Sequence, residues 1–186
     1  MEKVAARLDY LQNALGLSFP EREIQNLLAL DNPGKPHIAN LMVKYGYAGT
    51  KEQAITGYID RAGVPDACVR PEEAIRGILE GGGVPVLAHP GLGRGDEHIV
   101  GDAMARRLRR LIDYGLQGIE AFYSTFTPQM RAEALAFAEA FGLYVTAGSD
   151  YHGGNKPIAL GDTKLGQAEA LPDGMRRFLE RVGEWR

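Results

Sequence analysis

Two short apolar segments, each ending abruptly in residue types that bind metals, constrain this chain more than any other feature. Residues 84–91 (VPVLAHPG) end their apolar run at His89, and the distant residues 143–153 (LYVTAGSDYHG) end theirs at Asp150 and His152. Apolar, β-branched runs bounded by glycine or proline are typical of buried parallel strands. Functional side chains of α/β barrels lie at the carboxyl ends of such strands. We therefore predict that these three side chains meet at one rim of a sheet.

The rest of the sequence indicates two segments with different patterns. Residues 2–66 have helical periodicity interrupted by glycine and proline, which predicts a helical module over residues 1–68. Over residues 69–186 helices and strands alternate, as in an α/β fold with a parallel sheet. The predicted elements are helices at 71–80, 99–114, 128–141 and 173–182 and strands at 84–88, 118–122 and 143–147.

A parallel sheet of three strands leaves two edges open and cannot close into a barrel. Exposed edges pair readily with other strands. We therefore expect a partner at the open edge, which is either a missing N-terminal segment or a second copy of the chain.

Composition excludes several classes of protein. The 21 basic and 24 acidic residues give a net charge of −3, which disfavours non-specific binding of nucleic acid. A nucleotide substrate remains compatible with this charge. The single cysteine excludes an intramolecular disulfide and a cysteine-based zinc cluster. No stretch approaches the roughly 18 apolar residues of a membrane span. These features predict a soluble, cytoplasmic protein without a membrane partner.

The chemistry of the predicted ligands indicates which metals they suit. Imidazole and carboxylate together suit manganese, zinc or iron better than calcium or magnesium. Asp150 and His152 are two residues apart, so their side chains share a face if the strand is still extended there. The alternative is that they are ordinary turn residues. We favour a metal site because two separate strand ends show the same break.

Two motifs resemble a known family. Ala88–Gly91 (AHPG) and Gly148–Gly153 (GSDYHG) resemble the third and fourth motifs of the PHP (polymerase and histidinol phosphatase) family of metal-dependent phosphoesterases. Its fold is a distorted (β/α)₇, TIM-like barrel with two or three divalent metal ions. The resemblance implies that residues 69–186 correspond to the last three strands of such a barrel and residues 1–68 to a helical insertion. The His-x-His pair with which family members open is not in this sequence.

The resemblance also implies a chemistry, which is hydrolysis of a phosphate ester by a metal-activated water. His89, Asp150 and His152 are then metal ligands. Lys35 and His37 are candidates for binding the substrate phosphate, beside the start of a predicted helix. The alternative is that Lys35 is a solvated turn lysine and His37 an ordinary residue of the first turn.

Three further residues lie near the predicted rim. Glu120 is either a carboxylate at the edge of the core or a partner of a metal-bound imidazole. Tyr123 follows the second strand and faces the same rim. His98 is predicted to lie in a surface loop, because its position matches no strand end.

Two functions of different classes follow from these observations. The first is a metal-dependent phosphatase or phosphodiesterase acting on nucleotides or short oligonucleotides. This chain would then be an incomplete fragment lacking the N-terminal metal motifs, with little or no activity alone. The second is a non-catalytic binding or assembly module with the same fold.

Overall fold

The computed structural model describes residues 2–65, 69–93, 97–167 and 170–183. The chain divides into two compact units, Met1–Cys68 and Val69–Arg186. Among the described residues, no helix is both long and apolar enough to cross a membrane.

The first unit is helical over its described part, residues 2–65, as predicted. Its elements are α1 (Glu2–Asp9), a π-helical turn (Tyr10–Ala14), α2 (Glu21–Leu28), α3 (Lys35–Lys44), α4 (Lys51–Gly57) and a 3₁₀ turn (Ile59–Ala62). Their buried apolar side chains form one core, with Leu11, Ile38, Met42 and Ile59 fully enclosed.

The helix starts of this unit follow local chemistry. Thr50 caps α4, because its hydroxyl oxygen accepts a hydrogen bond from the backbone N–H of Gln53 at 3.1 Å. Pro20 is the cap residue of α2, one position before the helix begins. Pro36 is the second residue of α3, where its missing N–H leaves no helical hydrogen bond unmade. Each of these two prolines therefore lies within one residue of a helix start.

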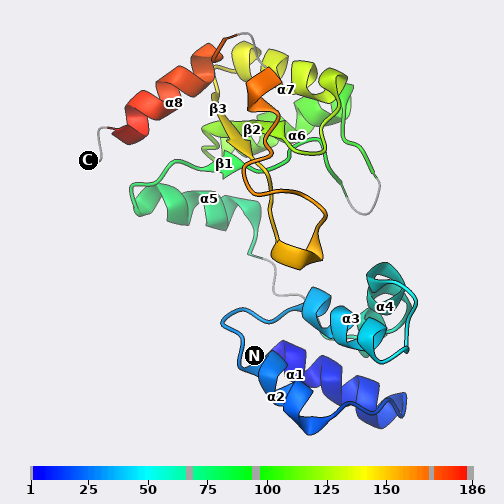
Figure 1. Cartoon of the computed structure of the whole chain (residues 1–186). Helices are drawn as coiled ribbons and strands as arrows, with labels where there is room; N and C mark the ends of the chain where they lie inside the picture. The colour runs from blue at the N-terminus through cyan, green and yellow to red at the C-terminus, as the bar shows by residue number, and fades with distance from the viewer. Residues whose placement is uncertain (1, 66–68, 94–96, 168–169, 184–186) are drawn as a thin grey trace. The chain divides into compact units, whose positions relative to one another are not determined.

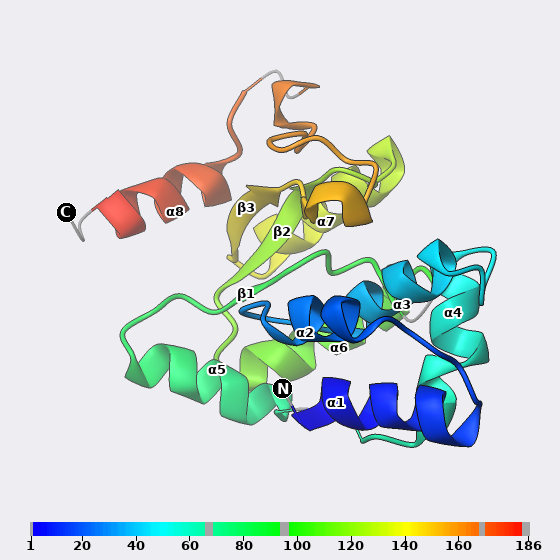
Figure 2. The same cartoon turned by 60° about the horizontal axis from the view of Figure 1, so that its bottom comes forward.

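The second unit alternates helices with a parallel sheet (Figures 1 and 2). Its elements are α5 (Pro71–Glu80), β1 (Val86–Leu87), α6 (Gly101–Asp113), β2 (Gly118–Tyr123), α7 (Pro128–Ala140), β3 (Tyr144–Gly148), two 3₁₀ turns (Gly153–Asn155 and Leu165–Gln167) and α8 (Asp173–Gly183). The three strands are parallel and lie in the order β1-β2-β3. The predicted parallel sheet is therefore present, as an open sheet of three strands.

One face of this sheet carries the core. Ile119 of β2 and Val145 of β3 pack with buried residues of α6 and α7, among them Leu108 and Ala134. On the opposite face Gly118 lies between the side chains of Val86 and Tyr144, since an added Cβ would meet both at 3.1 Å. The side chains of Val86 and Tyr144 are only partly buried. The sheet is therefore covered by helices on one face and partly exposed on the other.

One edge strand of the sheet is shorter than we expected, and a helix lies beside the other. β1 has two residues instead of the predicted five, because Pro85 has no N–H to offer to a ladder. At the other edge α8 lies beside β3 (Figure 2). There the guanidinium of Arg177 donates hydrogen bonds to the carbonyl oxygens of Gly142, at 3.3 Å, and Leu143, at 3.2 Å. Short strands and neighbouring helices both limit strand pairing at an edge, and a partner at either edge stays a prediction.

A β-bulge in β2 determines which side chains reach the rim. Glu120 pairs with Thr146, but the next pair along the strands joins Phe122 to Ala147, so Ala121 is an extra residue in β2. Side chains three residues apart in a regular strand point to opposite faces. The extra residue changes this, and Glu120 and Tyr123 both contact His89.

Candidate functional site

His89 lies two residues beyond the end of β1 and is held by two residues of β2. Its backbone N–H donates to Oε2 of Glu120 at 2.9 Å. Its ring packs against the ring of Tyr123, with 5.3 Å between the ring centroids. Both the backbone and the ring of His89 are therefore in contact with side chains of the adjacent strand β2.

Asp150 lies two residues beyond the end of β3 and also contacts Tyr123. Its Oδ2 accepts hydrogen bonds from the hydroxyl of Tyr123, at 3.0 Å, and from the ammonium of Lys156. The preceding residue is fixed as well, because the hydroxyl of Ser124 donates to the carbonyl oxygen of Ser149 at 3.0 Å. Tyr123 is therefore the residue that links the His89 and Asp150 ends of the sheet.

His152 contacts Asp150 in a different way from the one we predicted. The strand ends at Gly148, and Asp150 has φ of +53°, so the backbone turns before His152 instead of staying extended. Nδ1 of His152 lies 2.7 Å from the carbonyl oxygen of Asp150 and 3.3 Å from its Oδ1. The side chain of His152 is 55% exposed. The turn therefore brings the two side chains together, while the ring of His152 faces solvent.

Both rim positions have a backbone conformation that most residues avoid. His89 has φ of +31°, and the only other described non-glycine residues with positive φ are Asp150 and Lys164. Such conformations cost of order 1 kcal/mol or more, and they are concentrated at functional sites. Two of the three strained positions are thus predicted metal ligands.

Glu120 lies between the two strand ends. Besides accepting from His89, its carboxylate covers Gly148, where an added Cβ would overlap Oε1. Burial raises the pKa of Glu120, and the hydrogen bond from the His89 backbone opposes this rise only in part. The structure thus shows Glu120 as a carboxylate that accepts from the backbone N–H of His89.

The electrostatics of Asp150 are set by its partners. Burial alone raises the pKa of this carboxyl, but the hydrogen bonds from Lys156 and Tyr123 outweigh burial, and the pKa is lowered. The pKa of Lys156 is raised, because the hydrogen bond to Asp150 outweighs burial. Burial and the same carboxylate raise the pKa of Tyr123. Asp150 and Lys156 therefore form a charged pair at neutral pH.

The predicted ligands are connected but do not form a ready metal cage. His89 and Asp150 each contact Tyr123, and Asp150 contacts His152. The donor types, imidazole and carboxylate, fit manganese, zinc or iron. Within the described part of the chain, no group of three or more His, Cys, Asp or Glu is placed to hold a metal ion. The ligand set stays a prediction.

Lys35 and His37 lie in the helical unit, at the start of α3. The ammonium of Lys35 lies 2.8 Å from the carboxylate of Asp60. Nδ1 of His37 accepts from the backbone N–H of Gly34 at 3.1 Å, so the proton of a neutral ring is on Nε2. His37 also lines a pocket of 260 Å³ between α2 and α3. His37 thus has a local capping contact and an Nε2 donor left for a ligand.

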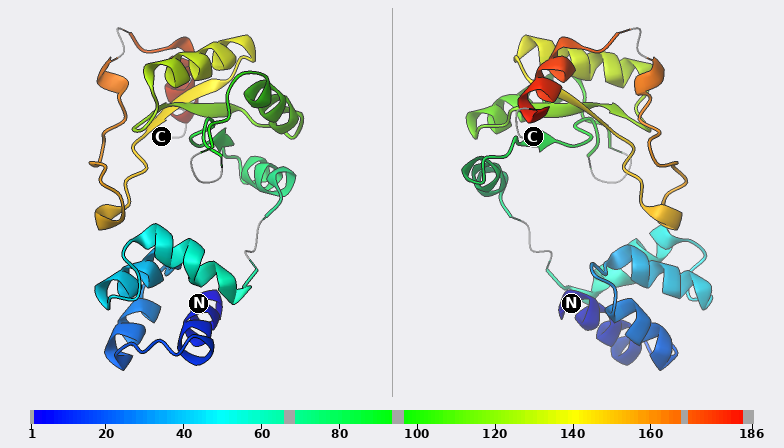
Figure 3. Two further views of the ribbon diagram at one scale, coloured as in Figure 1. Left: turned by 90° about the vertical axis from the view of Figure 1, so that its right-hand side faces the viewer. Right: turned by 60° about the vertical axis from the view of Figure 1, so that its left-hand side comes forward.

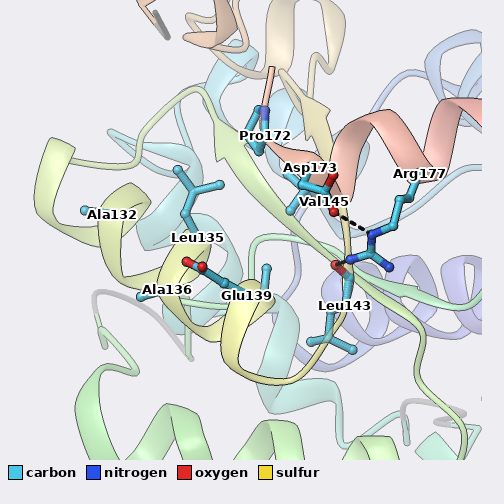
Figure 4. Close-up of a pocket in the computed structure, with 11 residues that line it drawn as sticks. Ala132, Leu135, Ala136, Glu139, Leu143, Val145, Pro172, Asp173 and Arg177 are labelled. Carbon is cyan, nitrogen blue, oxygen red and sulfur yellow. Dashed lines mark hydrogen bonds and ion pairs between the residues drawn. The ribbon is translucent and has the colours of Figure 1, made fainter. Parts of the chain in front are cut away.

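Other features of the second unit lie away from the rim. A pocket of 760 Å³ between α7, β3 and α8 is lined by residues such as Leu135, Val145 and Arg177, and it includes none of the predicted ligands (Figure 4). His98 is exposed and forms an isolated antiparallel bridge with Leu92, as expected of a surface loop.

Sequence reasoning missed Lys156. This residue follows the 3₁₀ turn Gly153–Asn155 in the excursion between β3 and α8, which Figure 3 shows leaving the sheet. A lysine six residues after Asp150, in a glycine-rich loop, was the available signal. Only the fold of the loop brings its ammonium back to the carboxylate.

Comparison with known proteins places these features in context. No family model matches the chain. It is 38% identical over 85 residues to a phosphoribosyl 1,2-cyclic phosphate 1,2-diphosphodiesterase from Eggerthella lenta, over 46% of this chain and 29% of that protein. It is 30% identical over 138 residues to the 5′-3′ exoribonuclease Rnm from Salmonella typhimurium, over 69% of this chain and 44% of that protein.

The fold is similar to that of a solved protein. The structure of a protein from Bifidobacterium adolescentis named as a metal-dependent phosphoesterase superposes with a TM-score of 0.68 at 29% identity. The match covers 97% of this chain and 64% of that one. The chain spans less than half the length of the two curated relatives.

Proposed function

Because the chain belongs to the PHP family of metal-dependent phosphoesterases, we propose that it forms part of an active site that hydrolyses phosphate esters of nucleotides or short oligonucleotides. The observation that carries this proposal is the meeting of His89 and Asp150 through Tyr123. Two strand ends that lie far apart in sequence are joined there by a single side chain.

In this proposal His89, Asp150 and His152 are metal ligands. A bound manganese, zinc or iron ion supplies a water of lowered pKa and neutralises charge on the phosphoryl group. Glu120 fixes the backbone of His89, and Tyr123 orients the carboxylate of Asp150 through its hydroxyl. These contacts hold two of the ligands in place before any metal binds.

We propose that Lys35 and His37 contact the phosphate of the substrate. The Nε2 proton of His37 and the ammonium of Lys35 are both suited to phosphate oxygens. The backbone N–H of Gly34 is already bonded to His37, so the side chains carry this role.

We also propose that hydrolysis requires further strands along the β1 edge. Three ligands are too few for two or three metal ions, and among the described strands β1 pairs with β2 alone. The added strands come from another polypeptide segment or from a second copy of the chain. The chain alone is then inactive or weakly active, and light scattering on the purified chain distinguishes self-association from a monomer.

A non-catalytic binding or assembly module is the second candidate function. The observation that favours it is the pairing of Asp150 with Lys156, because the ammonium already neutralises the carboxylate without a metal. A module of this kind needs neither the metal nor the phosphate contacts.

Metal binding separates the two functions. Titration calorimetry with MnCl₂ and with ZnCl₂ on the metal-free chain is compared with the same titration on His89→Asn and on the control His98→Asn, which changes an exposed histidine of the same unit. The phosphoesterase proposal expects His89→Asn to lose binding and His98→Asn to keep it. Equal binding by both variants refutes the proposed ligand role of His89.

Hydrolysis is the second measurement. The substrates are bis(p-nitrophenyl) phosphate, p-nitrophenyl phosphate, a nucleoside 3′,5′-bisphosphate and a 5′-phosphorylated oligoribonucleotide. Each is tested with the chain alone and with the N-terminal barrel segment of a related enzyme added. Metal-dependent turnover that appears with the added segment, and is absent in Asp150→Asn, supports the proposal. Metal binding without turnover in any mixture favours the binding module.

A further inference from the structure

Lys156 is the described cation closest to the predicted metal ligands. Its ammonium bonds Oδ2 of Asp150 and lies 3.4 Å from the hydroxyl oxygen of Tyr123. The side chain is 36% exposed, so it is partly withdrawn from water although it comes from a surface loop. The ammonium of Lys156 therefore has two partners, an ion pair with Asp150 and a hydrogen bond to Tyr123.

The carboxylate of Asp150 has little capacity left for another cation. Oδ2 accepts from Lys156 and Tyr123, and Oδ1 lies 3.3 Å from Nδ1 of His152. A divalent ion that binds this carboxylate needs one of these oxygens. It would also lie within a few ångströms of the ammonium, where like charges repel strongly in a partly buried site. Metal binding and the Lys156 contact therefore oppose each other, by competition at Oδ2 and by repulsion at Oδ1.

We propose that the ammonium of Lys156 is an internal counter-ion that holds Asp150 in the metal-free protein and is displaced when a divalent cation binds. This inference rests on the proposed function, because it requires Asp150 to be a metal ligand. The ion pair also has a structural role. It connects Lys156 to the turn that follows β3, where the backbone of Asp150 is strained. Lys156 therefore stabilises the empty site and weakens its affinity for metal.

The same excursion offers a matched control. Lys164 pairs with Asp162 at 3.0 Å, and its side chain is 34% exposed, close to the 36% of Lys156. Asp162 is not a predicted ligand. Lys164→Met therefore removes a similar ion pair without changing the site.

The test is calorimetric titration of MnCl₂ into metal-free protein at low ionic strength, for the full chain and for the Lys156→Met, Lys156→Arg, Lys164→Met and Asp150→Asn variants. We expect Lys156→Met to bind Mn²⁺ about tenfold more tightly, because one repelling charge is gone. Lys156→Arg keeps the charge and should bind as the unchanged chain does. Lys164→Met should also bind unchanged. The melting temperature of Lys156→Met without metal should fall below that of Lys164→Met.

The titrations separate the counter-ion role of Lys156 from the ligand role of Asp150. If Lys156→Met binds Mn²⁺ no more tightly than the unchanged chain, or does not bind it at millimolar concentrations, the counter-ion role is wrong. Loss of binding in Asp150→Asn together with that result leaves the proposed ligand role of Asp150 standing. If Asp150→Asn binds Mn²⁺ as well as the unchanged chain does, the ligand role of Asp150 fails and the counter-ion role fails with it.

Discussion

A methyl group added at Gly148 tests whether the carboxylate of Glu120 stabilises the two strand ends that it contacts. Its three nearest non-local heavy atoms around a built Cβ all belong to Glu120, and the Cβ would overlap Oε1. Gly148→Ala therefore forces the carboxylate away from its place. The hydrogen bond from the His89 backbone, 2.9 Å long, is lost when the carboxylate moves.

The magnitude follows from that one contact. A hydrogen bond to a charged acceptor contributes about 1.5–3 kcal/mol, and the lower half of this range applies because Glu120 is only partly buried. We expect Gly148→Ala to lower the free energy of unfolding by about 2 kcal/mol, which is a fall of roughly 4–8 °C in melting temperature for a chain of this size. In a Glu120→Ala background the same substitution should cost less than about 0.5 kcal/mol.

The assay is a double-mutant cycle. Unfolding in urea is followed by far-UV circular dichroism, with EDTA present, for the unchanged chain, both single variants and the double variant. The reasoning requires that Gly148→Ala loses most of its cost once Glu120 is alanine. An equal cost in both backgrounds shows that Gly148 is needed for some other reason, and the proposed link between Glu120 and the two strand ends is then refuted.

Three further predictions concern the second unit. Because burial raises the pKa of Glu120 above its ordinary 4.5, the unfolded chain releases this proton first, so the free energy of unfolding should fall as pH rises from about 4.5 through the raised pKa and then level off. Glu120→Gln should lack that fall in urea titrations made at several pH values with EDTA, and an unchanged profile would contradict the assignment. Thr127→Ala removes the hydroxyl that accepts from the backbone N–H of Met130 at 3.2 Å, and should cost about 1 kcal/mol in the same unfolding assay; no loss would mean that water replaces the cap. Leu108→Ala, at a fully enclosed position, should cost about 2–5 kcal/mol, while Leu160→Ala, 79% exposed, should stay within about 0.5 kcal/mol, and similar melting temperatures for the two would refute the assigned core.

The helices and the parallel sheet were readable from sequence because their causes are local. Pro128, with its fixed φ, marks the start of the helix predicted at 128–141, and the structure has α7 beginning at this residue. The family resemblance, carried by the two motifs around His89 and Asp150, is confirmed by the related proteins. Local chemistry and motif spacing were sufficient for these predictions.

The site was less predictable because its contacts depend on long-range geometry. Periodicity does not reveal the extra residue Ala121, which places Glu120 and Tyr123 on the same side of the sheet. The link between Asp150 and Lys156 depends on how a loop folds back, which no pattern of apolar residues encodes. The assignment of the three strands to part of a TIM-like barrel is a different case and stays a prediction, since a barrel needs strands beyond the three described ones.

The positive φ angles of His89 and Asp150 have a consequence for comparing related sequences. Glycine adopts such angles without strain, so replacing either residue by glycine relieves about 1 kcal/mol of backbone energy. Mutational drift that preserves only folding would accordingly favour glycine at residue 89, whereas glycine at residue 150 would also lose the hydrogen bonds from Tyr123 and Lys156. A homologue that keeps histidine and aspartate there retains residues with a strained backbone, which is evidence of selection for their side-chain chemistry. Glycine at both positions would mark a lineage that has lost this chemistry.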